Sequence, residues 1–497
     1  MLTRNLGHCD LSIRQPAYRT CGILERGLEN RMVVRAVRHL PLGIHKPFGK
    51  FVIAERETLA VESEYPGSFR IIRNDGRKEC LLRCRRQAKL TAAAHFHCRT
   101  KVEIRWEPDN VQAVCPACAA PGEFEKRADW ILDNHGTEWI QFNTARWSAF
   151  MGKIIRGIRG AGRDAAFNSA WTKDPLEAIY RYGSDYKAFV DAGATSFIVE
   201  DVSADLAILA DEDVGYPMGY AHRKFVHHEF AAALMAIKAH LPDTTLTPLF
   251  MIRDTLEQWD VIHHMPVAMQ RAAATNLNNY LVRGDRRIEP VTNGPHFCLA
   301  DGLTPEEWRF TRIAWDNGYT VPYAVPGVTA VWSDQRMHAE LDALIKTRRW
   351  HTAKWMAELA SRGAPVHKIA RIEDIGAVEG PLLVINPDLL PPKELEKALA
   401  YKGGPVLLLG GQVDAGRKSR FEIVMENGWG RTVFAGYGAM PAYESRIFRD
   451  DSRPKKDIAA MREPEGAVWT HPLAYADIGD GFVRSCVEIM TDLTGYP

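Results

Sequence analysis

The stretch Thr195-Ser-Phe-Ile-Val-Glu-Asp201 gives the clearest indication of the fold. Three large apolar residues in a row predict a strand that is buried on both faces, as strands of a parallel sheet are. Two carboxylates, Glu200 and Asp201, stand at the carboxyl end of this strand. In a parallel α/β barrel, that end is where the catalytic groups lie. The alternative is that the two acids cap the next helix and face solvent.

Strand-like and helix-like segments alternate on both sides of this stretch. Strands are expected at 102–106, 138–143, 164–171, 195–201, 245–252 and 280–282, and helices at 124–134, 148–159, 180–192, 225–240 and 265–276. Repeated strand–helix units predict a parallel sheet with right-handed crossovers. Five or more such units in one run favour a closed (β/α)8 TIM barrel over an open sheet. No glycine-rich phosphate turn follows any of these strands, which argues against a Rossmann fold.

A second α/β unit is expected at the C-terminal end. A long helix is predicted over 337–362, and a helix and Gly403-Gly404 separate two buried strands at 380–386 and 405–410. This order indicates a smaller flavodoxin-like or amidotransferase-like α/β domain. No cysteine nucleophile elbow lies on its strands, so amidotransferase chemistry is not expected. The expected organisation is a weakly patterned region 1–100, which could hold the first barrel strands, a barrel over 101–335, and the C-terminal domain over 336–497.

Composition limits the class of protein. The chain has 497 residues, of which 46% are hydrophobic and 25% charged, and its net charge is +1. These values are typical of soluble globular proteins and give no reason to expect binding to nucleic acid or to an anionic membrane. No run of about 18 apolar residues is present, so no transmembrane helix is expected. Residues 1–12 lack the apolar segment of a secretion signal, which predicts a cytoplasmic location.

Nine cysteines, an odd number, indicate reduced thiols or a metal site instead of a disulfide framework. Cys115-Pro-Ala-Cys118 has the spacing with which two thiolates share one tetrahedral zinc ion. Cys98, which lies beside two histidines, could complete a structural zinc site, as could the pair Cys80 and Cys84. The alternative is that these cysteines are buried free thiols or belong to a connecting loop.

The predicted strand ends share a chemical character. Amide, arginine and tryptophan side chains stand at or near them: Asn143, Arg146, Trp147, Asn168, Trp171 and Arg253. Amides and charged groups hydrogen-bond to sugar hydroxyls, and indole rings stack on the apolar face of a pyranose. We therefore expect these residues to bind a sugar, although each one alone could instead cap a helix or pack between elements.

Two carboxylic acids can divide the acid role and the nucleophile or base role of glycosidic bond cleavage. Glu200 and Asp201 are the first candidates for these roles, and Asp254, at the end of the next strand, is the second. Glu107 and Asp301 are further candidates for these roles. This chemistry requires no cofactor, and a zinc ion at the cysteines would be structural.

Several stretches resemble the family-42 glycoside hydrolases, the β-galactosidase-like group of barrel enzymes. They are Cys115-Pro-Ala-Cys118 before a helix with Trp130, the segment Asn293 to Gly302 followed by Leu303-Thr-Pro-Glu-Glu-Trp308, and the C-terminal α/β domain. The resemblance covers roughly residues 100–410. It implies a TIM barrel, a cysteine-bound structural zinc and a homo-oligomer, with a trimer as one form. The family's acid is a Glu that follows an Asn at a strand end, whereas here Thr144 follows Asn143 and no such pair stands at a predicted strand end.

The sequence thus predicts a cytoplasmic glycoside hydrolase-like protein that acts on an oligosaccharide or glycoside. Two alternatives remain open. The missing Asn-Glu pair favours a catalytically inactive relative that binds carbohydrate or only oligomerises. The other alternative is a metal-dependent hydrolase of another barrel class, with histidine ligands.

Overall fold

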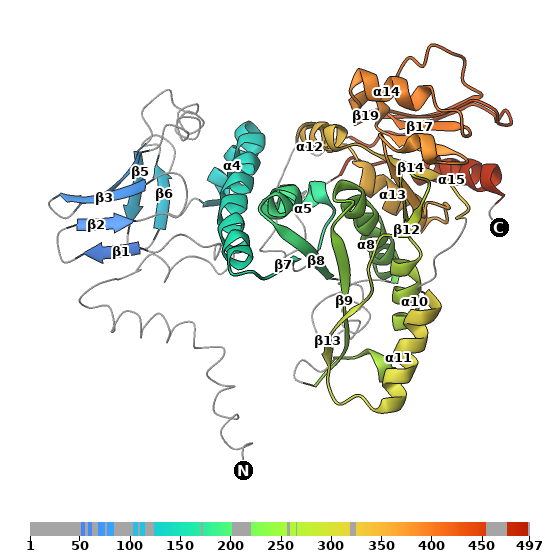
Figure 1. Ribbon diagram of the computed structural model, residues 1–497. Coiled ribbons are helices and arrows are strands. Elements are labelled where there is room, and N and C mark those ends of the chain that lie inside the picture. The colour runs from blue at the N-terminus through green and yellow to red at the C-terminus, as the bar shows by residue number, and fades with distance from the viewer. Residues whose placement is uncertain are drawn as a thin grey trace. The chain divides into compact units, whose positions relative to one another are not determined.

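The computed structural model describes the backbone of residues 51–54, 58–61, 68–74, 77–83, 103–107, 110–114, 124–169, 172–200, 220–255, 259–264, 266–318, 325–453 and 475–495. The chain divides into two compact units (Figure 1). The first comprises residues 1–150 and 464–470, and the second comprises residues 151–463 and 471–497. The fold belongs to the α/β class, as predicted, and its described strands form three sheets.

The described strands of the first unit form a six-stranded antiparallel meander. In sheet order they are β1 (Phe51–Ala54), β2 (Thr58–Val61), β3 (Ser68–Asn74), β4 (Arg77–Arg83), β5 (Glu103–Glu107) and β6 (Asn110–Val114). The strand predicted at 102–106 is therefore present as β5. It pairs with antiparallel neighbours, because only Pro108 and Asp109 separate it from β6, and so short a connection joins antiparallel strands.

One long helix, α4 (Phe124–Gly160), covers a region in which two helices and a strand are predicted. Its backbone leaves helical geometry at His135 (φ −141°, ψ 27°), where the first helix is expected to stop. The strand predicted at 138–143 is wrong, because these residues are helical. The rings of Trp139 and Phe142 lie 5.9 Å apart, at the one-turn spacing of a helix, and no glycine or proline interrupts residues 137–151.

The predicted central strand is β8 (Ala194–Glu200), and it lies between β7 (Ala165–Ser169) and β9 (Thr245–Asp254) in a parallel sheet. A further strand, β13 (His296–Ala300), pairs with β9 in parallel, and β10 (Trp259–Asp260) forms an antiparallel pair with the end of β9. The parallel strands predicted at 164–171, 195–201 and 245–252 are confirmed over their described residues, while residues 170, 171 and 201 lie outside the described part of the chain.

The helices that cluster with this sheet pack on one of its faces. They are α6 (Tyr186–Asp191), α10 (Pro266–Leu277) and α11 (Pro305–Gly318). Phe167 and Phe197, which pair in register, contact the aromatic rings of α6. Phe250 packs against Ala273 of α10 and Trp315 of α11. The register sets Phe250 on the same face as Phe167 and Phe197, because side chains alternate along each strand and paired residues face the same way.

A nine-stranded mixed sheet forms the rest of the second unit. Its order is β12 (Ile288–Pro290), β11 (Tyr280–Val282), β15 (Lys368–Arg371), β14 (Thr329–Trp332), β16 (Leu382–Ile385), β17 (Val406–Gly410), β19 (Gly430–Tyr437), β18 (Phe421–Asn427) and β20 (Arg446–Arg449). The strands from β11 to β17 in this order are parallel. The strands predicted at 380–386 and 405–410 are β16 and β17. The strand predicted at 280–282 is present as β11, but it joins this sheet and not that of β7 to β9.

Five longer helices accompany the mixed sheet. They are α8 (Tyr220–His240), α12 (Asp334–Thr347), α13 (Thr352–Ser361), α14 (Pro392–Leu399) and α15 (Asp480–Thr494). The single helix predicted over 337–362 is wrong, because α12 ends at Arg348 in the left-handed conformation (φ 59°) and α13 starts after His351. A left-handed residue ends a helix, and the apolar period on either side of it conceals the break.

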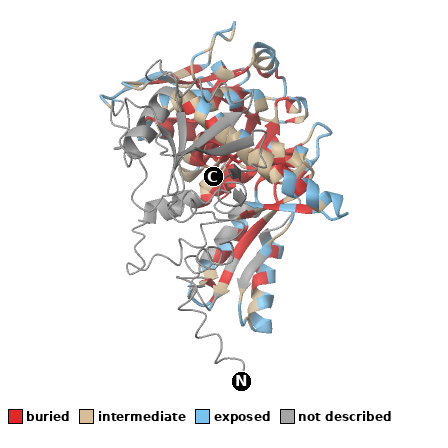
Figure 2. Cartoon of the chain, turned by 90° about the vertical axis from the view of Figure 1, so that its left-hand side faces the viewer, coloured by how far each residue is buried: buried red, intermediate tan, exposed pale blue. Residues whose placement is uncertain are grey.

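The core of the second unit surrounds α8, whose residues 230–240 are all buried. A helix that is buried all round marks the interior of a protein. It contacts β11, β14 and β15 of the mixed sheet and also α10 and α13. Figure 2 shows buried residues in the interior of this unit and exposed residues on its outer helices and loops. Among the described helices, none has both the length and the apolar character needed to cross a bilayer.

Candidate functional site

Three of the predicted sugar-site residues share a face of the parallel sheet. Asn168 pairs with Ile198, two residues before Glu200, and Glu200 pairs with Leu249, four residues before Arg253. Because side chains alternate between faces, Asn168, Glu200 and Arg253 lie on the same face, opposite the one that carries Phe167, Phe197 and the packed helices. Asn168 is exposed, and Glu200 and Arg253 are half-buried.

Backbone and side-chain hydrogen bonds fix the ends of these strands. The backbone N–H of Glu200 donates to Oγ1 of Thr172 at 2.9 Å, which ties the end of β8 to the segment after β7. Arg253 donates from Nη1 to the carbonyl oxygens of Asp301 and Gly302, and its Nε lies 3.4 Å from Oδ2 of Asp260. Arg253 is therefore held in place at the end of β9, with part of its guanidinium still exposed.

Asp254 and Asp301, two other predicted acids, lie further from Glu200 or are engaged in hydrogen bonds. Asp254 closes β9, about five residues beyond Leu249, which is level with Glu200. At ~3.3 Å per residue its backbone lies roughly 17 Å further along the sheet. The further candidate Asp301 follows β13 and accepts hydrogen bonds from the backbone and the hydroxyl of Thr255. Trp171 and Asp201, as well as the side chain of Asp254, lie outside the described part of the chain.

Asn143, Arg146 and Trp147 do not stand at a strand end, so that part of the prediction is corrected. All three lie on α4 in the first unit. Asn143 donates to the carbonyl oxygen of Trp139 one turn earlier, and Trp147 stacks on Phe150 with ring centroids 5.5 Å apart. The predicted zinc ligands Cys98, Cys115 and Cys118, and the side chain of Glu107, lie outside the described residues.

A buried cluster that the sequence did not predict joins α5 (Pro175–Tyr182), α13 and the segment before α15. Its members are Asp174, Glu177, His351 and Tyr475. Only 5%, 3% and 2% of Asp174, Glu177 and His351 are exposed. Nε2 of His351 lies 3.8 Å from Oδ2 of Asp174 and 3.6 Å from Oε1 of Glu177. Converging carboxylates and an imidazole are typical of metal sites and of proton-sharing networks.

Local sequence explains how α5 presents its two acids. Asp174 caps the helix: its Oδ1 accepts from the backbone N–H groups of Leu176 and Glu177 at 3.0 and 3.2 Å. Pro175 occupies the first helical position, where a missing N–H costs nothing. Glu177 follows in the first turn, and its Oε2 accepts from Nε of Arg181 at 2.9 Å. The Tyr475 hydroxyl hydrogen-bonds to Oε1 of Glu177 and lies 2.8 Å from Nε2 of His351.

Burial and charge act against each other on the acidity of this cluster. Burial raises the pKa of Asp174 to about 6, against the opposing effect of His351. Burial would also raise the pKa of Glu177, but Arg181 and His351 hold it well below its usual range. Burial alone would lower the pKa of His351, yet Asp174 and Glu177 raise it above its usual value. The cluster thus favours a positive charge at its centre.

A second histidine is held between two acids near β10. Nδ1 of His263 lies 2.7 Å from Oδ2 of Asp260, and its Nε2 hydrogen-bonds to Glu307. Glu307 also accepts from the backbone N–H of Thr304, whose hydroxyl in turn accepts from the N–H of Glu307. This is the reciprocal capping of the start of α11. Both ring nitrogens of His263 are bound by carboxylates, and one of these, Glu307, caps α11. We therefore assign His263, Asp260 and Glu307 a structural role at the start of this helix.

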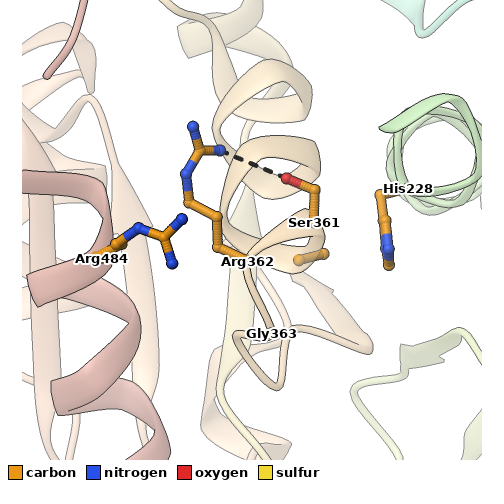
Figure 3. A pocket seen from close by; sticks show the side chains of 6 residues that line it. His228, Ser361, Arg362, Gly363 and Arg484 are labelled. Atoms are coloured by element: carbon orange, nitrogen blue, oxygen red, sulfur yellow. Dashed lines mark hydrogen bonds between the residues drawn. The ribbon is translucent and has the colours of Figure 1, made fainter. Parts of the chain in front are cut away.

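A surface hollow of about 380 Å³ lies at the end of α13 (Figure 3). Its lining is His228, Ala360, Ser361, Arg362, Gly363 and Arg484. In Figure 3 the two arginines lie on one side of the hollow and His228 on the other. Arg362 pairs with Asp480 and Glu358, and Arg484 pairs with the same Asp480, so both guanidinium groups already bind carboxylates. Because these arginines already bind carboxylates, we do not assign an anion site to the hollow.

The chain was compared with models of known protein families, with curated proteins and with solved structures, and none of the three comparisons found a match.

The sequence offered only a partial signal for the buried cluster. Asp174-Pro175 indicates a helix start, and Glu177 follows at capping distance. His351 and Tyr475 lie far away along the chain, and nothing in their neighbourhoods marks them as partners. Only the tertiary packing of α5, α13 and the segment before α15 brings them together.

Proposed function

We propose that the chain is a glycoside hydrolase, which cleaves a glycosidic bond of an oligosaccharide or glycoside at the carboxyl ends of its parallel strands. The observation that carries this proposal is the common face of Asn168, Glu200 and Arg253. An amide, a carboxylate and a guanidinium on one face can hydrogen-bond to sugar hydroxyls, and the carboxylate can transfer a proton. The register spreads the three residues over roughly 20 Å at ~3.3 Å per residue, so they would contact different parts of an oligosaccharide.

The arrangement of the parallel sheet supports a barrel. Its strands β7, β8 and β9 lie side by side in chain order, and the helices that cluster with it pack on the opposite face. In a (β/α)8 barrel, neighbouring strands follow each other in this way, helices cover the outside, and the other face lines the interior. A doubly wound sheet would instead carry helices on both faces. We therefore propose that β7 to β9 are an arc of a barrel of the family-42 type.

Glu200 is assigned as one of the two reacting acids. It stands at the carboxyl end of β8, and the Thr172 hydroxyl holds its backbone in place. The second acid is Asp201 or Asp254. A retaining enzyme needs carboxyl groups about 5–5.5 Å apart and an inverting enzyme about 6.5–9.5 Å. The offset of roughly 17 Å between the backbones of Glu200 and Asp254 at ~3.3 Å per residue therefore favours Asp201.

The mixed sheet is proposed as a scaffold. Its strands β15, β14, β16 and β17 follow the order 2-1-3-4 of a flavodoxin-like sheet, whose ligand crevice lies at the carboxyl ends of the strands where the order reverses, here β14 and β16. The buried Arg336 occupies this place. It donates to the carbonyl oxygen of Ile385 at 2.7 Å and to that of Val331. A protein side chain thus fills this crevice among the described residues, and we do not place the reaction there.

A panel of nitrophenyl glycosides tests the proposal. The full-length protein is expected to release nitrophenol from at least one sugar, and Glu200→Gln is expected to abolish the release while the protein stays folded. The matched control is Glu422→Gln, a half-buried acid on the mixed sheet, which should keep full activity. If the protein binds sugars but turns over none of the panel, the proposal fails in favour of a carbohydrate-binding relative.

That second function is favoured by one sequence observation, the absence of an Asn-Glu pair at any predicted strand end. The metal-dependent barrel hydrolase receives less support. The described group of possible ligands, Asp174, Glu177 and His351, is closed off from solvent, whereas a catalytic metal keeps an open position for substrate or water.

A further inference from the structure

We infer that Asp174, Glu177 and His351 form a structural metal site for a divalent transition ion such as Zn²⁺, with Tyr475 as a fourth oxygen at the same centre. This site is separate from the proposed glycosidase face and from the cysteines. It uses one donor atom from each residue: Oδ2, Oε1 and Nε2.

The distances fit a site that needs little rearrangement. The three donor atoms lie within 4.8 Å of one another. Nε2 of His351 is 3.8 Å from the oxygen of Asp174 and 3.6 Å from that of Glu177. In a tetrahedral site with bonds of about 2.0–2.1 Å, ligand atoms stand roughly 3.3–3.4 Å apart. The two measured pairs therefore have to close by a few tenths of an ångström, and the Tyr475 hydroxyl, which bonds to the donor atoms of Glu177 and His351, has to move outwards as the ion enters.

Each carboxylate is already oriented by a hydrogen bond to its other oxygen. Oδ1 of Asp174 is held by two backbone N–H groups at the start of α5, and Oε2 of Glu177 is held by Arg181. Both residues thereby turn the remaining oxygen towards Nε2 of His351. Outer hydrogen bonds that fix one ligand oxygen and present the other are the arrangement that prepares a metal site.

The charges leave room for a cation. Arg181 and Glu177 pair at 2.9 Å, and both are more than nine-tenths buried. Asp174 is equally buried, its hydrogen bonds come from neutral backbone N–H groups, and its charged partner is His351 at 3.8 Å. Buried carboxylates need a positive charge beside them, and a divalent ion that takes the place of the proton on His351 would supply it.

The donor set selects the kind of ion. An imidazole nitrogen beside carboxylate oxygens suits Zn²⁺ and related transition ions, whereas Mg²⁺ and Ca²⁺ prefer oxygen ligands alone. The closed surroundings indicate a structural role. The ion would join α5, α13 and the segment at Tyr475, which lie far apart in the sequence of the second unit.

Zinc content tests the inference without any measurement of activity. The full-length protein is loaded with Zn²⁺, freed from excess by gel filtration and analysed for metal. The wild type should hold one more equivalent than His351→Gln. The matched control His240→Gln, which removes a different buried histidine, should keep that equivalent, and so should a double variant of Cys115 and Cys118 to serine.

Cobalt loading of the wild-type protein is a second measurement that needs no variant to fold. Nitrogen and oxygen ligands give visible Co²⁺ absorption without the intense thiolate bands of a cysteine site, and Mg²⁺ should not compete for the site. Zinc should also raise the melting temperature of the wild type and leave that of Asp174→Asn unchanged. Equal zinc in wild type and His351→Gln, or only thiolate-type Co²⁺ absorption, would overturn the inference.

Discussion

The hydroxyl of Tyr475 lies 2.8 Å from Nε2 of His351, although the two residues are far apart in the sequence. Two backbone-directed bonds run alongside it: the N–H of Ala476 donates to the carbonyl oxygen of Arg348, and the indole of Trp350 donates to the carbonyl oxygen of Ala476, each at 2.7 Å. The segment before α15 is thereby fastened to the connection between α12 and α13.

Tyr475→Phe should destabilise the protein by about 1.5–3 kcal/mol, because it removes a hydrogen bond to the charged Glu177 and leaves that buried oxygen unsatisfied. Chemical denaturation measures the free energy of unfolding. Tyr443→Phe is the control, since its hydroxyl bonds to the carboxylate of Asp492 at the exposed surface, and it should cost well under half as much. Equal losses of unfolding free energy in the two variants would show that burial does not strengthen the hydrogen bond of Tyr475.

Arg336→Ala should cost about 3–5 kcal/mol, because it leaves the buried carboxylate of Glu340 without its cation. It also removes the donors that satisfy the carbonyl oxygens of Val331 and Ile385. Arg312→Ala, at an exposed helical pair with Asp316, should change the unfolding free energy by less than about 0.5 kcal/mol. A small effect at Arg336 would contradict its role as the filling of the sheet's crevice.

Gly410→Ala should be strongly destabilising. Gly410 has a φ of 137°, and an added Cβ would lie 2.7–2.9 Å from atoms of Asn386. The strand end therefore requires glycine both for its backbone and for close approach. Gly157→Ala, where a Cβ meets nothing within 4 Å on α4, should instead stabilise the helix by about 0.5–1 kcal/mol. Thermal melts of both variants check this, and a Gly410→Ala protein as stable as the wild type would refute the packing.

Stability should fall on the acid side through Asp334. Burial alone would raise its pKa, but the hydrogen bond and charge of His240, with Trp332 and Arg371, hold the pKa well below the ordinary 3.8. A carboxyl group with a lowered pKa stabilises the fold above its unfolded pKa, and that contribution is lost as the pH falls below about 4. Asp334→Asn should therefore flatten the acid limb of a pH–stability curve.

The control for this pH curve is Asp316→Asn, an exposed acid on α11. It should leave the acid limb as steep as that of the wild type. An unchanged limb in Asp334→Asn would mean that other carboxylates dominate the acid response.

Local patterns predicted the parallel strands well, because β7, β8 and β9 are short apolar runs between helices of clear period. They failed at 138–143, where Trp139, Ile140 and Phe142 fit a strand over six residues but belong to a longer helix. They also failed at Arg348, since a single left-handed residue leaves no trace in hydrophobic periodicity. The hydrophobic pattern also could not predict which sheet a strand joins. The sequence of β11 is typical of a barrel strand, yet β11 pairs with β15 of the mixed sheet.

Some residues of the candidate sites could be predicted from the sequence and others could not. Asn168, Glu200 and Arg253 could be found from the sequence, because each stands near the end of a recognisable strand. His351 and Tyr475 could not, because their partners on α5 reach them only through tertiary packing. Spacing along the chain identifies residues on one element, and it gives no information on which elements meet.

The most direct test of the glycosidase proposal is kcat/KM of Glu200→Gln against that of the wild type on the best aryl glycoside. Loss of a general acid or base costs about 10²–10⁴-fold, so a fall of at least a hundredfold in the folded variant is expected, with Glu422→Gln unchanged. A Glu200→Gln protein that cleaves the substrate at the wild-type rate would contradict the proposal.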